Sequence, residues 1–440
     1  MSNLGKARIV PQSPMRTSEG SWLIISELDY QSAIHEGIRL RTAGDYGSAM
    51  GLLVNLTVEQ PRNVMAYLEA GRTQYAGKQL APAMDWFKQA ETIAPHNFWP
   101  YFMQAEVLQA LSQNEQALGV LEIGLAKCNG RVSDLKYTNL IKRFIDTQAL
   151  CLEAGRAGAP AFLAHPPLPG RPLPGALQAT VVKDADDIIF ASLDASYQAG
   201  IRYFAIADNE SSDATRSEIE RFRKAHADCI VLLLTDPIMG HFQAAKTMGL
   251  VRLASTVLEG LGIALDWIFP LDADELLYVS PDAGDLAGLL ASERAAAKKI
   301  LVYHHANAMS PDIHEALPVG ADVVKLFPAY ARLGRVPVRK VAFRNLAAAY
   351  VEEGNHFCSG IVGGPGDIIS GMEAGVFLRH FPMRSLSQMR SKVVNGGNSI
   401  AAVANPGIGA HWRVDFENYQ GLGDAYLLRR IQDYNAMARA

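Results

Sequence analysis

Three acidic residues, Asp272, Asp274 and Glu275, directly follow an apolar run that begins at Trp267. An apolar run of this length that ends in charge is typical of a buried strand. In open α/β sheets, ligands bind outside the carboxyl ends of the strands. Two carboxylates spaced as Asp-x-Asp offer the oxygen ligands that a hard divalent cation prefers, with positions left open for phosphate. The spacing therefore predicts a cation site for nucleotide chemistry, whereas a helix cap or surface turn is the competing interpretation of an isolated Asp-x-Asp.

A second polar cluster, residues 205–215, follows an apolar run and precedes a helical pattern. Its position predicts that it lies at the ligand-binding edge of the sheet. Asp208 could accept a hydrogen bond there from a nucleobase N–H or a ribose hydroxyl. Ser212, Asp213 and Thr215 are residue types that commonly cap helices. We expect capping from some of these residues and a ligand contact from Asp208.

Basic side chains gather in two stretches downstream of the acidic motif. Isolated cations are usually structural, but several cations that follow a metal motif favour a clamp for phosphate groups. The first stretch holds Lys340, Arg344 and His356, and the second holds His380, Arg384 and Lys392.

The elements that must position these residues begin near residue 176, where strand and helix patterns alternate. We expect strands at 177–182, 201–207 and 229–234, and helices at 186–199, 217–226 and 243–261, ahead of the strand that carries the acids. Such alternation predicts βαβ units in a Rossmann-like, mostly parallel sheet.

The region before this sheet has almost no strand signal and repeats with a period of 34 residues. Small residues recur at two positions, a large apolar residue recurs between them, and a proline ends the unit. The matched sets are Gly37, Gly71 and Ala105; Ala49, Ala83 and Ala117; Leu53, Phe87 and Leu121; Tyr67 and Tyr101; and Pro61 and Pro95, with Asn129 at the third position. This all-α pattern resembles the tetratricopeptide repeat. A generic helical bundle is the competing interpretation, but only stacked repeats must keep their register.

Composition shifts divide the chain into five segments. We predict a flexible N-terminus at 1–29, helical repeats at 30–155, a Pro/Gly-rich linker at 156–175, the α/β domain at 176–400, and a helical extension at 401–440. The prolines of the linker forbid a continuous helix. The apolar stripe of the extension could pack, dimerise or contact a membrane surface, and packing is its commonest fate.

The composition restricts the classes of function. The formal net charge of −4 gives no sign of a nucleic-acid-binding surface. Four cysteines lie far apart, which argues against a metal knuckle or a disulfide framework. We expect no membrane span and no signal peptide, and hence a cytoplasmic protein.

Four stretches together carry a resemblance to a known family. They read V-V-K-D-A-D-D-I-I-F-A-S-L, G-I-R-Y-F-A-I-A-D-N-E-S-S-D-A-T, D-W-I-F-P-L-D-A-D-E-L-L and R-H-F-P-M-R-S-L-S-Q, in this order between residues 181 and 388. The set resembles family 2-like glycosyltransferases with a GT-A fold, in the branch with a Leu-Asp-x-Asp-Glu motif. The chain departs from that family at Asp184, Ala185, Glu210 and Leu276.

The resemblance implies roles for individual residues. It implies that Asp272 and Asp274 hold Mn²⁺ or Mg²⁺ on a diphosphate, and that a later histidine, His380 or else His356, completes the site. It implies that Asp208 contacts the nucleotide. The residues that we assign to the nucleotide-sugar site are Lys183, Asp208, Asn209, Asp213, Gln243, Arg384 and Lys392.

The implied reaction is metal-dependent transfer of a sugar from a UDP- or GDP-linked donor to a glycan, lipid or protein acceptor. The resemblance implies inversion, which requires a general base for the acceptor hydroxyl. The candidates are Glu275, Asp312 and Glu315; the last two lie in a histidine-containing stretch, residues 304–315, that could instead bind a metal.

Two further functions remain open. The first is a repeat-based scaffold that carries an inactive sugar-nucleotide module, with a protein partner on the repeats. Ala185 and Glu210 leave this function open, whereas the intact Asp272, Asp274 and Glu275 argue against it. The second is another nucleotide-handling enzyme, which would need a glycine-rich phosphate loop after Val182, where none occurs.

Overall fold

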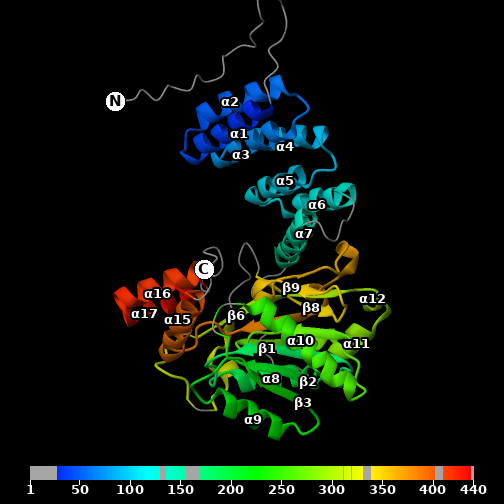
Figure 1. The fold of residues 1–440 in the computed structure, drawn as a ribbon, viewed down its shortest axis with the longest axis vertical. Helices are drawn as coiled ribbons and strands as arrows, with labels where there is room; N and C mark the ends of the chain where they lie inside the picture. The colour runs from blue at the N-terminus through cyan, green and yellow to red at the C-terminus, as the bar shows by residue number, and fades with distance from the viewer. Residues whose placement is uncertain are drawn as a thin grey trace, which may run out of the picture. The chain divides into compact units, whose positions relative to one another are not determined.

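The computed structural model divides the chain into two compact units, residues 1–151 and 152–440 (Figure 1). It describes residues 27–128, 135–154, 169–238, 240, 242–310, 312–318, 320–330, 338–401 and 410–437. Most of the predicted flexible N-terminus and most of the predicted linker lie outside these residues. Within them, no helix has both the length and the apolar character needed to span a membrane.

The first unit, here called the repeat unit, is entirely helical where it is described. From α1 to α6, successive helices contact one another as antiparallel neighbours joined by short turns (Figure 1). The helices are α1 (Glu27–Thr42), α2 (Tyr46–Glu59), α3 (Val64–Ala76), α4 (Leu80–Ile93), α5 (Phe98–Ala110), α6 (Asn114–Cys128) and α7 (Leu135–Ala154). The predicted tetratricopeptide-like repeats correspond to the pairs α1–α2, α3–α4 and α5–α6.

Close approach within each helix pair explains the small residues of the period. A methyl group on Gly71 in α3 would lie 2.4 Å from the ring of Phe87 in α4. One repeat earlier, a methyl group on Gly37 in α1 would lie 2.9 Å from the side chain of Leu53 in α2. Real Cβ atoms do not approach this closely, so glycine lets the large apolar side chain of the second helix pack on the backbone of the first.

Two polar contacts also repeat after 34 residues. The hydroxyl of Tyr67 donates to the carbonyl of Pro61 at 3.2 Å, and Tyr101 donates to Pro95 at 2.7 Å. The side chains of Asn63 and Asn97 cap α3 and α5 by accepting from the second residue of each helix. The tyrosines and prolines of the period therefore fix the turn between repeats.

The second unit, here called the sheet unit, holds a ten-stranded sheet, a small hairpin and the C-terminal helices. Its strands are β1 (Ala176–Val182), β2 (Tyr203–Asp208), β3 (Ile230–Thr235), β4 (Trp267–Pro270), β5 (Glu275–Val279), β6 (Ile300–Met309), β7 (Ala329–Tyr330), β8 (Arg339–Arg344), β9 (Tyr350–Val351), β10 (Cys358–Ser359), β11 (Ile368–Ser370) and β12 (Val376–His380). Its helices are α8 (Ile189–Gln198), α9 (Thr215–Ala225), α10 (Gln243–Gly260), α11 (Leu286–Ala291), α12 (Glu293–Ala296), α13 (Val323–Leu326), α14 (Gly371–Ala374), α15 (Leu386–Ala401), α16 (Ala410–Leu422) and α17 (Asp424–Met437).

The sheet is mixed, which corrects the expectation of a mostly parallel one. Its order is β3-β2-β1-β4-β8-β6-β12-β5, with β7 and β11 paired to β6. The first four strands are parallel, but β8 runs antiparallel to both β4 and β6, and β5 runs antiparallel to β12. The elements expected between residues 177 and 261 are present, with ends shifted by three residues at most. Sequence alternation detected the parallel half, whereas the other half has no long helical connections to reveal it.

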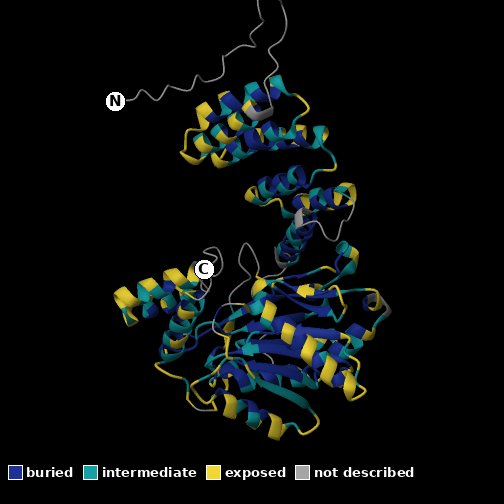
Figure 2. Ribbon diagram, in the orientation of Figure 1, coloured by how far each residue is buried: buried dark blue, intermediate teal, exposed yellow. Residues whose placement is uncertain are grey.

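The core of the sheet unit follows the strands. Figure 2 shows buried residues gathered along the sheet and exposed residues on the outer sides of the helices that cover it. The largest buried side chains include Phe204, Trp267, Phe269 and Tyr303. The apolar run that begins at Trp267 forms two strands, because β4 ends at Pro270 and β5 begins at Glu275. The two aspartates lie in the tight connection between them.

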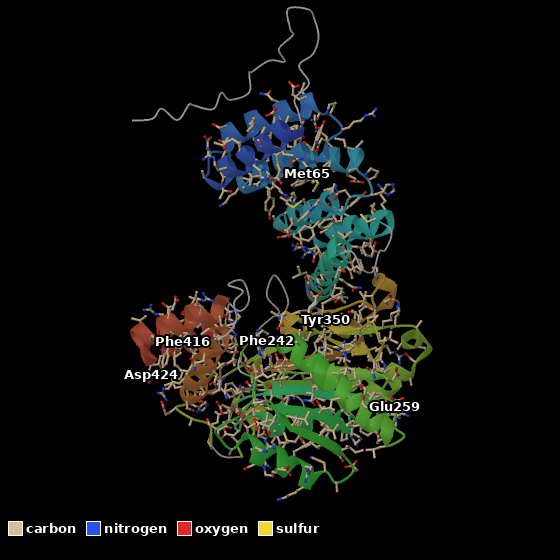
Figure 3. All side chains as sticks on the ribbon, viewed as in Figure 1. Met65, Phe242, Glu259, Tyr350, Phe416 and Asp424 are labelled. Atoms are coloured by element: carbon tan, nitrogen blue, oxygen red, sulfur yellow. The ribbon has the colours of Figure 1, made fainter. Side chains whose placement is uncertain are left out.

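The C-terminal extension packs on α15. Leu427 and Ile431 of α17 are buried against apolar side chains of α15 that include Met389 and Val393. Figure 3 marks Phe416 on α16 and Asp424 on α17. The predicted helical extension thus forms two helices, and its apolar stripe is used in part for packing.

Candidate functional site

Strand pairing brings the acidic loop, which holds Asp272, Asp274 and Glu275, together with β6 and β12. Register places Glu275 of β5 opposite His380 of β12, and His380 beside Asn307 of β6. The connection from β4 to β5 follows the carboxyl end of β4, which pairs with β1 in the parallel half of the sheet. The acids therefore lie where ligands bind in open sheets.

Asp272 is held by three donors. Lys340 Nζ lies 2.6 Å from Oδ2, while Gln243 Nε2 and Asn355 Nδ2 lie 2.5 and 3.2 Å from Oδ1. Burial raises the pKa of Asp272 against the opposing charge of Lys340. The Lys340 side chain is almost fully buried, so this contact cannot be replaced by water without a rearrangement.

Glu275 lies beneath the aspartates. Its Oε1 is 2.9 Å from Lys340 Nζ and 2.7 Å from His305 Nε2, and its Oε2 accepts the backbone N–H of Asp272 at 3.0 Å. Burial opposes its ionisation, but Lys340 and His305 outweigh burial and hold the pKa of Glu275 well below its usual range. Glu275 is ionised and fully buried, and both of its oxygens have partners that hold the loop in place. A carboxylate with so low a pKa is a poor proton acceptor, which argues against the predicted role of general base.

Asp274 faces a different pair of cations, of which Lys392 is partly exposed and Arg384 is buried. Lys392 Nζ donates to Oδ2 at 2.7 Å, and Arg384 Nη1 lies 3.9 Å from the same oxygen. Burial opposes ionisation, yet the positive charges of Lys392 and Arg384 hold the pKa of Asp274 well below its ordinary value. Oδ1 is 3.8 Å from His380 Nε2.

The environment of His380 makes it a competent ligand. Its Nδ1 lies 2.8 Å from Asn307 Oδ1, an acceptor, so Nδ1 carries the proton and Nε2 keeps its lone pair. Burial, and then the charge of His305, lower the pKa of His380 well below its usual value, so the ring is neutral at neutral pH. Neither Asp274 Oδ1 nor His380 Nε2 has a hydrogen bond to another described residue, and a carboxylate oxygen and an imidazole nitrogen this close fit a divalent cation.

A wider set of ligand atoms surrounds the same place. Donor atoms of Glu275, His305 and His380 lie within 4.8 Å of one another, and the two imidazole rings stack with centroids 4.2 Å apart. His305 Nε2 is engaged with Glu275, and Glu275 with Lys340. Asp274 and His380 are therefore the better pair for a cation, with Glu275 and His305 as supports behind them.

These groups line a cavity of about 610 Å³, a volume typical of small-molecule sites. Its wall combines the carboxyl end of β1, the amino end of α10, the acidic loop, β6, β8, β12, and the helices α15 to α17. Of the predicted site residues, the wall includes Lys183, Asn209, Gln243, Asp272, Asp274, Glu275, His356, His380 and Lys392.

Some wall residues have structural bonds. Lys183 Nζ donates to the carbonyls of Asn209 and Glu210, both at 2.9 Å. The Asn209 amide donates to the carbonyls of Asp236 and Ile238. His356 Nδ1 contacts the carbonyl of Arg339, and burial together with Lys340 lowers the pKa of His356 to about 4. These contacts shape the wall and leave His356 outside the group of cation ligands around His380.

Five predicted site residues do not line the cavity. Asp208 is buried, with its oxygens accepting from Ser211 N and Arg216 Nη1. Asp213 accepts from Asp186 N and from Thr215 N, the first residue of α9, so backbone donors engage both of its oxygens. The sequence pattern placed both at the correct strand end but could not show that local donors occupy their oxygens.

The remaining three are Arg384, Asp312 and Glu315. Arg384 forms a two-pronged bond to Asp187, both contacts 2.8 Å, and is unsuited to a phosphate clamp. Asp312 and Glu315 are exposed, and Arg390 binds Glu315 at 2.5 Å. Arg384 and Glu315 therefore form ion pairs. Neither Asp312 nor Glu315 lines the cavity, so the structure does not support either acid as the general base.

Several wall residues were not predicted or were given other roles. Lys340 was expected on phosphate, but it neutralises Asp272 and Glu275, and no sequence feature separated it from the arginines of the same strand. His305 and Asn307 face the site from β6, and their spacing of two residues indicates a shared strand face. Trp412, Asp415 and Arg430 reach the wall from the C-terminal extension, where no sequence feature separated them from packing residues.

No protein-family model and no curated protein sequence matches the chain. Solved structures with similarity to it include the type III secretion translocator chaperone SycD of Yersinia enterocolitica, at 16% identity over 30% of this chain and 98% of that chain, with a TM-score of 0.27. The TPR2B domain of yeast Sti1, in a complex with a pHsp70 partner, matches at 14% identity over 28% and 99%, with a TM-score of 0.26. A TPR protein of Thermus thermophilus matches at 23% identity over 28% and 66%, with a TM-score of 0.24. TM-scores this low do not establish a shared fold. The repeat assignment rests on the helix pairs described above.

Proposed function

We propose that the sheet unit is a GT-A-type glycosyltransferase that moves a sugar from a UDP- or GDP-linked donor to an acceptor hydroxyl. The supporting observation is the pairing of Asp274 Oδ1 with the free Nε2 of His380, 3.8 Å apart, in a cavity of about 610 Å³ at the end of β4. A carboxylate oxygen and a neutral imidazole suit Mn²⁺, and the carboxylate suits Mg²⁺. A divalent cation at these two residues would stabilise the negative charge of a leaving diphosphate.

The cations of the cavity wall are suited to the same leaving group. Lys392 reaches the cavity from α15, and its side chain is 28% exposed while its Nζ contacts Asp274 and the Pro382 carbonyl. A flexible lysine at this position can turn to a diphosphate oxygen, whereas Lys340 is fixed beneath Asp272. In this proposal Lys392 binds the leaving group, and Asp272 organises the loop through Gln243 and Asn355.

The proposal predicts that a sugar nucleotide and Mn²⁺ stabilise the full chain together. Ligand at 100 times its dissociation constant adds about 2.7 kcal/mol to the stability of the state that binds it. Thermal unfolding with UDP- and GDP-sugars, with and without Mn²⁺, measures this effect. Release of UDP or GDP should fall by about 10²–10³-fold in Asp274→Asn, the range expected when one element of charge stabilisation at the reacting centre is lost, because the variant would hold the cation less well. A chain that gains no metal-dependent stability, or an Asp274→Asn variant with unchanged turnover, contradicts the proposal.

One observation favours the second candidate, a repeat scaffold with an inactive sugar-nucleotide module. Both oxygens of Asp272 already accept from Lys340, Gln243 and Asn355. A cation that needs both aspartates would have to displace a buried lysine. Stabilisation by UDP alone, unchanged by Mn²⁺ and without turnover of any donor, would select this function.

A further inference from the structure

The C-terminal helices contribute a wall of the cavity that holds the acidic loop. Trp412 and Asp415 of α16 and Arg430 of α17 line it together with Asp274 and His380. Trp412 and Asp415 are three residues apart, so they lie on the same face of α16. The cavity therefore has two chemically different sides, one from the sheet and one from the extension.

The position of α16 is fixed by glycines of α15. A methyl group on Gly396 would lie 2.7 Å from the Trp412 ring, and one on Gly397 would lie 2.3 Å from the ring of Phe416. Because neither glycine has a side chain, both rings pack directly on the α15 backbone. Figure 3 shows Phe416 among the C-terminal helices that carry this contact. This packing presents the face with Trp412 and Asp415 to the cavity.

Asp415 is a buried carboxylate that α17 orients. It is 8% exposed, its Oδ1 accepts from the hydroxyl of Tyr426, and its Oδ2 lies 3.3 Å from Arg430 Nη2. Tyr426 and Arg430 are one helical turn apart, so α17 holds the carboxylate from two successive positions. Each carboxylate oxygen has two acceptor sites, which leaves capacity for a further hydrogen bond.

A buried tyrosine of α17 responds to the charge of the acidic loop. Burial raises the pKa of Tyr434, and the negative charge of Asp274 raises it further. The Tyr434 hydroxyl is buried and has no hydrogen-bond partner among the described residues.

Each of the four carboxylates of the wall among the described residues has a cationic partner, and these partners differ in how far they are exposed. Asp272 and Glu275 share the buried Lys340, and Asp274 faces Lys392 and His380. Asp415 of α16 is paired with Arg430, but the Arg430 side chain is 41% exposed and can turn away from the carboxylate, whereas the Lys340 side chain is 3% exposed.

We propose that Asp415 is the general base for the acceptor hydroxyl, and that the acceptor is a saccharide whose apolar ring face lies against Trp412. The inference rests on the proposed glycosyl transfer and adds to it the acceptor class and the base. Asp415 takes the proton of the acceptor hydroxyl as that oxygen bonds to the anomeric carbon. The bond from the anomeric carbon to the phosphate oxygen breaks, and its electron pair leaves with the nucleoside diphosphate.

The test measures nucleoside diphosphate release by the full chain from UDP-glucose and GDP-mannose, with a panel of methyl glycosides as acceptors. General-base catalysis contributes about 10²–10⁴-fold, so Asp415→Asn should lower transfer by at least about 100-fold. The dissociation constant of Asp415→Asn for UDP in the presence of Mn²⁺, measured by calorimetry, should stay within about twofold of that of the unaltered chain. Trp412→Ala should raise the KM for the methyl glycoside about tenfold and leave the KM for the donor unchanged.

Two control variants separate catalysis from helix packing. Glu417→Gln changes an exposed carboxylate on the same helix and should behave as the unaltered chain. Tyr426→Phe removes a donor to Asp415 but keeps the carboxylate. A base keeps most of its activity in Tyr426→Phe, whereas a purely structural Asp415 predicts equal losses in Tyr426→Phe and Asp415→Asn. Melting temperatures of all variants check the fold.

The outcomes separate the inference from the proposed function. If the unaltered chain binds UDP and transfers sugar while Asp415→Asn transfers at the same rate, Asp415 is not the base. If donor turns over but no methyl glycoside is accepted, the saccharide assignment is wrong. A chain that neither binds UDP nor turns over a donor removes the transfer reaction itself.

Discussion

The two units of the chain differ in what they bury. The described helices of the repeat unit bury mainly apolar and small residues, and Glu69 is an exception, paired with Arg41 and Arg72. The sheet unit buries carboxylates, lysine, arginine and histidine together, with Glu275 and Lys340 at the centre.

This difference has an energetic meaning. A helix pair packed by complementary size gains stability from every residue that it buries. A buried ion pair gains little over an apolar pair of the same shape, because desolvation offsets the attraction. A chain that places many charges in one region of a unit therefore gives up stability there, which is typical of sites that bind charged ligands.

The largest test of this contrast is Lys340→Met. The substitution leaves Asp272 and Glu275 buried without their shared cation, and we expect a loss of about 3–5 kcal/mol in the sheet unit. Hydrogen exchange resolved by peptide reports each unit separately. The matched change at an exposed lysine of the repeat unit, Lys88→Met, should stay within about 0.5 kcal/mol. Equal effects of the two substitutions would remove the contrast.

The next test addresses packing in the repeat unit. Gly71→Ala places a methyl group against the Phe87 ring, and we expect a loss of about 1–3 kcal/mol by overpacking. Gly51→Ala, in α2, meets open space and should gain about 0.5–1 kcal/mol from helix propensity. Chemical denaturation followed by helix circular dichroism compares the two. A stabilising Gly71→Ala would show that close approach does not set the period.

A pH test concerns the buried histidine of β6. Burial, and then the charge of Arg339, lower the pKa of His304 to about 3 from an ordinary value of 6.5. The unfolded chain takes up this proton below pH 6.5 and the native chain does not, so stability falls as the pH decreases from 6.5 toward 3. At pH 5 the loss is about 2 kcal/mol.

His304→Leu should remove this loss from the sheet unit. Neither ring nitrogen of His304 has a hydrogen-bond partner among the described residues, so leucine leaves no bond broken. The measurement is denaturant unfolding of both chains at pH 7 and pH 5. An identical pH dependence with and without His304 would contradict the assignment.

The smallest expected effect concerns the hydrogen bonds that repeat in the turns. Tyr101→Phe removes the bond to the Pro95 carbonyl, and we expect a loss of about 1 kcal/mol. Tyr67→Phe should show a similar loss one repeat earlier. Tyr46→Phe alters an exposed tyrosine and serves as the control in thermal unfolding. If neither substitution lowers the stability, the hydrogen bonds do not contribute to the turn, and the size of the tyrosine side chain alone defines it.

The sequence predicted the site in part. Acids at the end of an apolar run indicated the carboxyl end of a strand, and the 34-residue period indicated stacked helix pairs, because both depend on contacts that are close in sequence. Asp208 and Asp213 were assigned to a ligand because residue type and position cannot show that Ser211, Arg216 and the start of α9 supply their partners.

By itself the sequence determined the helix repeats and the alternation of β1 to β4, since hydrophobic periodicity follows directly from helix and strand geometry. It also determined that acids follow β4. The tertiary structure alone decided that Lys340 neutralises Asp272, that Asn307 orients His380, and that Asp415 faces the same cavity. Each of these contacts joins elements more than 60 residues apart, where strand pairing and helix packing, rather than local pattern, set which side chains meet.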